Sequence, residues 1–196
     1  MLSKTRAALL ATAIAAMPLS AAALTTQEAT SLTNTIVQEV QGYIQSGASL
    51  SSKQASFRTT MDRYADMNAI GRYVLGVNWR SATPAQQAAF TQAFRTYVSN
   101  KYGSQFSDYQ GAQIAVGGAR DLGDRGIVVD STVSRAGGAP IAVQWQFSDR
   151  SGRPLLVDIV AEGVSLLTSE RSAIGNMLDR RGGNLDQLIA DLPNAG

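Results

Sequence analysis

Residues 155–167 read LLVDIVAEGVSLL, and this stretch decides the fold of the chain. Its first seven positions carry apolar side chains on both faces, which predicts a strand that is covered on two sides. Gly163 permits a tight turn, and Ser165 is a suitable N-cap for a helix over residues 166–180. The stretch therefore predicts a β-strand that turns directly into a helix.

The chain before this strand predicts helices with well-marked ends. Apolar residues recur at helical spacing over residues 25–45, 50–64 and 67–75, and Asp66 and Gly76 fit the start and the end of the third helix. The run Thr83-Pro84-Ala85-Gln86 combines an N-cap, a proline in the first turn and a capping box. We expect the helix that begins there to extend to about Asp108, with an aromatic stripe from Phe90 to Phe106.

Four strands are expected near residues 112–116, 125–134, 139–147 and 153–161. Short turns at 136–138 and 149–152 make neighbouring strands antiparallel, and Gly117-Gly118 is interpreted as a further turn. Helices over 165–180 and 184–192 follow, separated by a helix stop at Gly182-Gly183. This order predicts an α+β domain, a curved antiparallel sheet of about four to five strands covered by several helices, with the aromatic stripe as its natural cover.

The first 23 residues have the pattern of a cleaved signal peptide. Lys4 and Arg6 precede an apolar run that is too short to span a bilayer, Pro18 ends it, and residues 21–23 are a small-residue cleavage site. No cysteine follows that site, which excludes a lipoprotein anchor. We therefore expect residues 1–23 to be removed and residues 24–196 to form a single exported, soluble domain.

Composition excludes several classes of function. Residues 1–23 hold two of the 17 basic residues and none of the 15 acidic ones, so the processed chain has a net charge near zero, which argues against nucleic-acid binding. The chain contains neither histidine nor cysteine, which removes catalytic triads, cysteine nucleophiles and the usual zinc sites. Asp158 and Glu162 could form an acid–base pair, but on a strand their Cα atoms would be about 13 Å apart. Hydrogen bonds to backbone donors at the strand–helix junction are the better interpretation.

An ordered set of motifs resembles the MlaC or toluene-tolerance family of periplasmic phospholipid-binding proteins over residues 28–192. The set consists of Tyr64-Ala65-Asp66, residues 75–80 (LGVNWR), a helix with Gln87, Phe90, Phe94 and Tyr97, the D-x-x-x-E-G-V-S-L of residues 158–166, Arg171, and residues 183–189 (GNLDQLI). The resemblance implies a lipid cavity between sheet and helices, and a periplasmic phospholipid carrier with neither enzyme activity nor a cofactor or metal. Its implied partners are an outer-membrane lipoprotein–porin complex and an inner-membrane ABC transporter with MCE domains, between which lipid moves to maintain outer-membrane lipid asymmetry.

Two groups of residues are expected to form the site. The residues predicted to line or support the cavity are Tyr73, Trp79, Phe90, Phe94, Tyr97, Val129, Val143, Trp145 and Ile159. Arg72, Arg80 and Arg171 are predicted at the rim, where a guanidinium could meet a phosphate, although Arg80 could instead form a salt bridge within its loop. The alternatives left open are a solid aromatic core, a lipid-free binding module of the same shape, and a carboxylate-dependent hydrolase.

Overall fold

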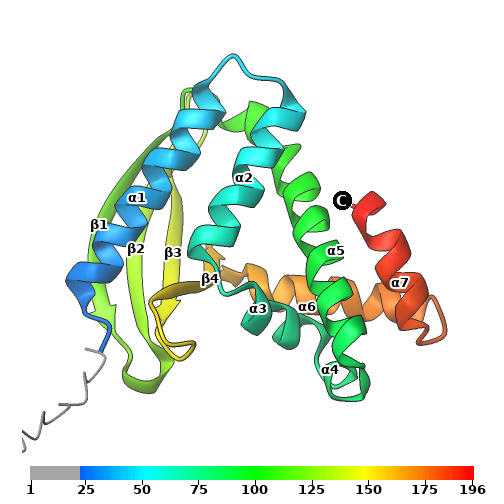
Figure 1. Cartoon of the computed structure of the whole chain (residues 1–196). Coiled ribbons are helices and arrows are strands. Elements are labelled where there is room, and N and C mark those ends of the chain that lie inside the picture. The colour runs from blue at the N-terminus through cyan, green and yellow to red at the C-terminus, as the bar shows by residue number, and fades with distance from the viewer. Residues whose placement is uncertain (1–22) are drawn as a thin grey trace, which may run out of the picture.

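The computed structural model describes residues 23–196, so all but the last residue of the predicted signal peptide lie outside the described residues. An N-terminal group of helices precedes a β-sheet, and two more helices follow it (Figure 1). The helices are α1 (Thr26–Gln45), α2 (Leu50–Tyr64), α3 (Met67–Leu75), α4 (Asn78–Ser81), α5 (Pro84–Gly103), α6 (Leu166–Asp179) and α7 (Leu185–Asp191).

Local capping signals set the helix starts. Thr25 and Thr83 each complete a capping box, with Glu28 and Gln86 respectively. Asp66 accepts a hydrogen bond from the Ala69 amide at 2.9 Å and starts α3. The predicted starts of these helices are confirmed. Each start depends on residues within four positions of it, which is why the sequence alone could predict it.

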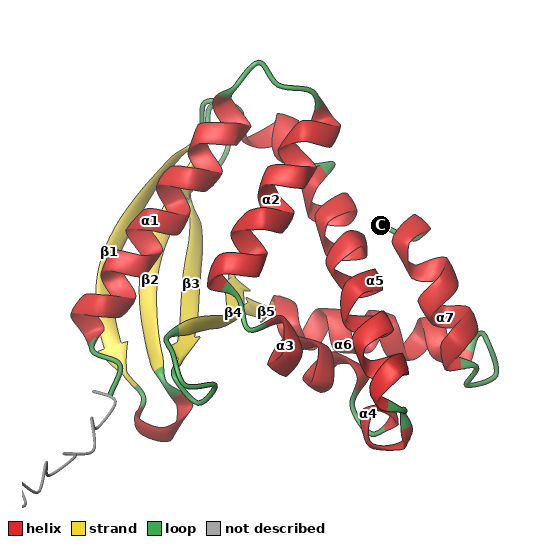
Figure 2. Ribbon diagram, in the orientation of Figure 1, coloured by secondary structure: helices red, strands yellow, loops and turns green. Residues whose placement is uncertain are grey.

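The sheet is antiparallel, and its five strands follow one another in the order of the chain. Its strands are β1 (Gln113–Asp121), β2 (Ile127–Ser134), β3 (Ile141–Ser148), β4 (Leu155–Ala161) and the two-residue β5 (Val164–Ser165). Glu162 and Gly163 both have positive φ, 50° and 81°, and form the tight turn between β4 and β5. Ser165 then caps α6 through the Thr168 amide, so the predicted strand–turn–helix is confirmed with a short added strand. The α+β class and the curved antiparallel sheet are confirmed as well (Figure 2).

The described part of the chain, residues 23–196, forms two separate hydrophobic cores. One joins α1 to the inner face of the sheet and includes Ile36, Val129 and Phe147. The other lies among the helices and includes Phe90 and Ile174. In Figure 1 α1 lies over β1 and β2, whereas α3, α5, α6 and α7 form a second group, and α2 stands between the two.

Two sequence-based expectations about helix α5 are wrong. The helix ends at Gly103, not near Asp108, and a 3₁₀ turn over Phe106–Tyr109 follows. After this tighter turn, the centre of the Phe106 ring lies 5.6 Å from the ring centre of Tyr43 and 5.4 Å from that of Phe57. The aromatic stripe also does not pack on the sheet, because Phe90, Phe94 and Tyr97 belong to the core among the helices, with residues of α3, α6 and α7.

The interpretation of Gly117-Gly118 as a turn is wrong too. Both glycines lie inside β1, where the pairing with β2 shifts between Val116 and Ala119. A Cβ at Gly117 would lie 3.3 Å from the Asp130 carbonyl oxygen. The pair therefore marks a β-bulge with close backbone approach, which glycine tolerates best.

Candidate functional site

An apolar cavity of about 340 Å³ lies between the two cores. Its walls come from α1, α2, α3, the C-terminal half of α5, the start of α6 and strands β1 to β4. The apolar side chains that line it are Ile36, Val40, Ile44, Phe57, Met61, Ala65, Met67, Ile70, Val74, Phe94, Val98, Phe106, Ala112, Ile114, Val133, Val143, Trp145, Leu156, Val157, Ile159, Leu166 and Leu167. A space walled mainly by such side chains suits a hydrocarbon chain, which needs no hydrogen-bond partners.

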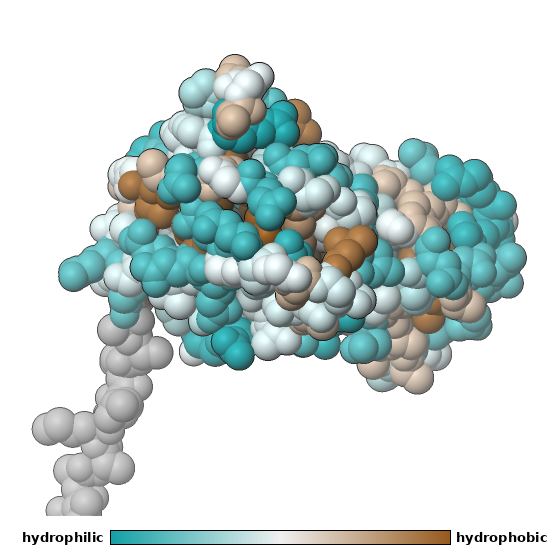
Figure 3. All heavy atoms as spheres, turned by 90° about the horizontal axis from the view of Figure 1, so that it is seen from above, coloured by the Kyte–Doolittle hydropathy of each residue, from teal (hydrophilic) through white to brown (hydrophobic). Residues whose placement is uncertain are grey.

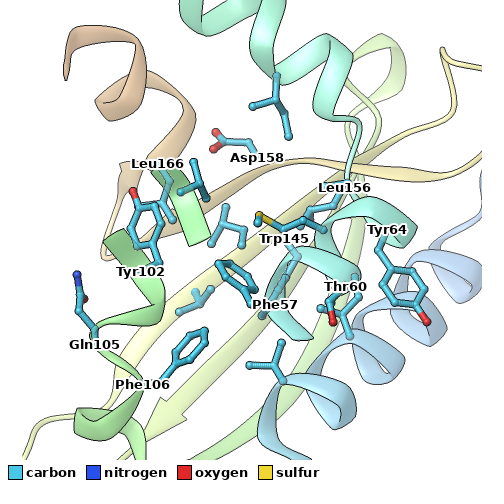
Figure 4. Close-up of a pocket in the computed structure, with 18 of the residues that line it drawn as sticks. Phe57, Thr60, Tyr64, Tyr102, Gln105, Phe106, Trp145, Leu156, Asp158 and Leu166 are labelled. Carbon is cyan, nitrogen blue, oxygen red and sulfur yellow. The ribbon is translucent and has the colours of Figure 1, made fainter. Parts of the chain in front are cut away.

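Side chains from distant parts of the chain point into this space (Figure 4). Phe57 of α2, Phe106 of the 3₁₀ turn and Trp145 of β3 converge there. Tyr102 and Gln105 lie on one side of the view, and Thr60 and Tyr64 of α2 lie on the other. Residues of α2 and α5, two helices that precede the sheet in the chain, thus lie on two different sides of this space.

A hydrogen bond within the sheet holds the Trp145 ring in place. Its indole nitrogen donates to the Ser131 hydroxyl at 2.8 Å, and that hydroxyl donates to the Val143 carbonyl at 3.2 Å. The indole is 7% exposed. Because its N–H is satisfied within the sheet, the ring can face the cavity at no hydrogen-bonding cost.

The solvent edge of the cavity carries uncharged amides. Gln45 and Gln105 are exposed and Gln41 is half-buried, and all three line the cavity. Gln41 also donates to the Ala112 carbonyl at 3.3 Å, which ties α1 to the start of the sheet. Figure 3 shows a mainly hydrophilic outer face in which hydrophobic side chains appear only as small patches.

A polar contact joins α1 to α2 beside the cavity. The Glu39 carboxylate accepts hydrogen bonds from the hydroxyls of Thr60 (3.0 Å) and Tyr64 (2.8 Å) and pairs with Arg63 at 3.1 Å. The hydrogen bond to Glu39 raises the pKa of Tyr64. Glu39 therefore fixes the spacing of the two helices that form this wall.

The opposite wall contains a buried ion pair. Glu170 of α6 is 3% exposed, and one carboxylate oxygen accepts from Lys101 at 2.7 Å and from the Tyr102 hydroxyl. Burial alone would lower the pKa of Lys101, but its hydrogen bonds to Glu170 and Tyr97 raise it overall. Burial, together with the bond to Glu170, raises the pKa of Tyr102. This cluster locks α5 to α6 at the cavity wall.

Removing one member of this pair is expected to destabilise the fold. Lys101→Met leaves the Glu170 carboxylate buried with only Tyr102 as partner. Breaking a buried pair costs about 3–5 kcal/mol, and since the Lys101 side chain is 35% exposed, we expect about 2–3 kcal/mol. The double variant Lys101→Met with Glu170→Met removes the stranded charge and should recover much of this loss in urea unfolding. Equal instability of the single and double variants would contradict the assignment of Lys101 and Glu170 as a buried ion pair.

The carboxylate of Asp158 has a structural role, as expected from the sequence. One oxygen accepts from the Leu167 amide at 3.0 Å and the other from the Ser165 hydroxyl at 2.6 Å. Both contacts fix the start of α6. Glu162 lies in the β4–β5 turn, where its amide donates to the Ala142 carbonyl at 2.9 Å.

The structure places the nine predicted cavity residues in three settings. Phe94, Val143, Trp145 and Ile159 line the cavity. Phe90, Tyr97 and Val129 are fully buried in the adjoining cores, where they can support its walls. Tyr73 and Trp79 lie away from it, in a second, open pocket on the other side of α3. Contact of any of these residues with lipid stays a prediction.

The three arginines predicted at the rim come together, but not at the cavity. Arg72, Arg80 and Arg171 line the second pocket. Helix α3 lies between the two spaces: Ile70 and Val74 line the cavity, whereas Arg72 lines the outer pocket. A lipid whose tails fill the cavity would therefore present its phosphate elsewhere. The alternative salt bridge of Arg80 is not seen among residues 23–196.

Sequence reasoning missed the contribution of α1 and α2 to the cavity. Val40, Phe57, Met61 and Tyr64 all line it. The signal was present, because Phe57, Met61 and Tyr64 repeat on one face of α2. The spacing shows that a face is apolar, but not whether that face meets a core or an open space.

Residues 23–196 hold no group of three or more acidic side chains placed to bind a metal ion. No helix in this described part combines the length and hydropathy that a bilayer span requires.

Comparisons with known proteins agree on one family. The family described as "MlaC protein" matches residues 30–194. The intermembrane phospholipid transport system binding protein MlaC of Haemophilus influenzae is 26% identical over 133 residues, which are 66% of this chain and 61% of that protein. The toluene tolerance protein ttg2D of Pseudomonas putida is 24% identical over 125 residues, 63% of this chain and 58% of that protein. The chain thus spans about three fifths of the length of these relatives.

A solved structure shares the fold. The phospholipid-binding protein from Ralstonia solanacearum, solved in complex with a phospholipid, superposes with a TM-score of 0.73 at 22% sequence identity. The match covers 85% of this chain and 96% of the other. Since the family match extends over most of the chain, this protein belongs to the MlaC family.

Proposed function

We propose that this protein binds a phospholipid with its acyl tails in the apolar cavity and carries it between membranes. The observation that carries the proposal is the cavity itself, a space of about 340 Å³ between two separate cores, walled almost wholly by hydrocarbon. Family membership and the relative solved with a phospholipid support it.

Burial of hydrocarbon supplies the affinity. Each methylene removed from water contributes about 0.8 kcal/mol, so one tail of about 16 carbons contributes on the order of 12 kcal/mol. Most of this is offset when the lipid comes from a bilayer, where its tails are already dry. Extraction therefore needs an interior as apolar as the membrane, and it needs no catalytic group.

The headgroup belongs at the solvent edge of the cavity. A phosphate taken inside would need paired charges, and Lys101, next to the cavity wall, is already paired with Glu170. Gln45 and Gln105 at the edge offer amide donors and water access. We therefore propose polar recognition at Gln45 and Gln105 rather than at the predicted arginines.

Membership of the MlaC family supports a proposal about the wider role of the protein. We infer that the processed chain works in the periplasm and passes phospholipid between an outer-membrane lipoprotein–porin complex and an inner-membrane ABC transporter with MCE domains, which would maintain outer-membrane lipid asymmetry. Signal-peptide removal, a single lipid-binding domain over 24–196 and the absence of enzyme activity are parts of this proposal. One relative is named as the binding protein of an intermembrane phospholipid transport system, and this name supports the proposal.

Organic extraction of the purified protein followed by mass spectrometry tests the proposal. We expect phospholipid at close to stoichiometric amounts. Protein without lipid that also fails to load from vesicles would favour the lipid-free binding module. Release of fatty acid or headgroup from added phospholipid, abolished by Asp158→Asn, would favour the hydrolase.

A further inference from the structure

Four arginines form one surface on the outer side of α3. Arg72 of α3, Arg80 of α4, Arg150 of the β3–β4 turn and Arg171 of α6 are all exposed and line the same open pocket. We call this surface the arginine face. About seventy residues of chain separate Arg80 from Arg150, so the fold assembles a concentrated positive charge on a chain whose processed form is close to neutral.

The arginine face lacks acidic partners. Five ion pairs are found among residues 23–196, and none of them involves these four guanidiniums. Arg171 donates to the Tyr73 carbonyl at 2.9 Å, and Arg150 donates to that of Asp124. Asp66, which adjoins the pocket, is 7% exposed and bonded to the Ala69 amide and the Ser151 hydroxyl. Within residues 23–196 these four guanidiniums are therefore not paired with a carboxylate, and all four side chains are exposed.

Apolar side chains are exposed on the same surface. Val77 is 73% exposed and Tyr73 is 41% exposed, and the Arg171 guanidinium lies 4.9 Å from the Tyr73 ring centre. Exposed aliphatic and aromatic groups next to arginines suit the membrane interface, where apolar groups enter the headgroup region and basic ones meet phosphates. An acidic protein surface would use the charges but would gain less from an isolated Val77.

We propose that the arginine face docks this protein on the surface of an anionic phospholipid bilayer. Guanidinium forks match phosphate oxygens in pairs, and the four arginines present them on one side of the molecule. Because α3 separates this face from the cavity, docking and cargo binding use different residues. The proposal goes beyond cargo carriage, and failure of one leaves the other standing.

Vesicle co-sedimentation of the processed protein tests the docking proposal. We expect binding to vesicles that contain phosphatidylglycerol, weak binding to pure phosphatidylcholine, and loss of binding as salt rises. Arg72→Gln with Arg80→Gln removes two side chains that make no hydrogen bond or ion pair within residues 23–196. Each arginine lost near a charged membrane weakens binding about fivefold, so this variant should bind about 25-fold more weakly.

A matched control removes the same charge elsewhere. Arg135→Gln with Arg180→Gln changes two exposed arginines outside the face and should retain binding within about threefold. Val77→Ser should weaken the binding that persists at high salt. Both arginine variants should keep their co-purified lipid, which separates docking from cargo loading.

Two results would overturn the proposal. One is equal loss in the two double variants, which would mean that net charge alone attracts the protein to the vesicle. The other is no binding to anionic vesicles by the unmodified protein while Arg72→Gln with Arg80→Gln still blocks lipid transfer between membranes. The face would then serve an acidic protein partner.

Discussion

Val143→Arg is expected to abolish phospholipid loading. Val143 lies in β3 opposite Ser131 and Ala161, is 8% exposed and lines the cavity. An arginine there would extend into the space for a tail and bring its hydration water with it. Because the cavity gives the new side chain room, we expect folding to survive with a loss of about 1–3 kcal/mol, and extraction to yield less than a tenth of the normal lipid.

Val129→Arg provides the matched control. Val129 lies in the neighbouring strand, faces the same core and is fully buried, but it does not line the cavity. The same substitution has no space to enter there and should unfold the protein, with a cost above about 4 kcal/mol. Circular dichroism and urea unfolding distinguish the two outcomes. Unfolding by both variants alike would indicate that the region around Val143 is as tightly packed as a solid core.

Removal of bound lipid is expected to lower the melting temperature by about 5–10 °C. The empty protein retains a cavity whose lining has lost its contacts, and cavities weaken cores by about 24 cal/mol per Å³ where the walls do not collapse. A ligand specific to the folded state adds about 2.7 kcal/mol at a hundredfold excess over its Kd, and a chain of this length gains about 2–4 °C per kcal/mol. Differential scanning calorimetry of loaded and delipidated protein measures the difference.

The source of this stabilisation is tested by adding parts of the lipid back. Phospholipid should restore the melting temperature, whereas glycerophosphate, which has the headgroup without tails, should leave it unchanged. Full rescue by glycerophosphate would show that polar recognition dominates. No shift with either compound in protein shown to be empty would contradict the cavity account.

Local signals in the sequence were sufficient to predict most of the fold. Thr25, Asp66, Thr83 and Ser165 each cap a helix through donors three residues away, so neighbouring residues carry the information. The alternation in β3 likewise gives its buried face, with Trp145 and Phe147 inside. The family resemblance then supplied the expectation of a cavity, which no local pattern contains.

Long-range packing accounts for what could not be predicted. The aromatic stripe of α5 was recognised as apolar, but its period does not say whether it meets a sheet or other helices, and Phe90 packs with α3, α6 and α7. Arg72 and Arg171 were both expected at a headgroup, and the fold does bring them together. Helix α3 nevertheless turns Arg72 away from the space that Val74 lines, and residue spacing along the chain does not reveal that separation.

Quenching of Trp145 by tail-brominated phospholipid tests the central claim most directly. The chain has two tryptophans: Trp145 lines the cavity and Trp79 lies in the outer pocket, so Trp79→Phe isolates the cavity probe. Loading that variant with phospholipid brominated along its acyl chains should strongly quench its fluorescence, because a bromine atom quenches an indole that it contacts. Trp145→Phe, which keeps only Trp79, should show little quenching. The reverse pattern, with Trp79 quenched and Trp145 unaffected, would place the tails outside the cavity and contradict the account.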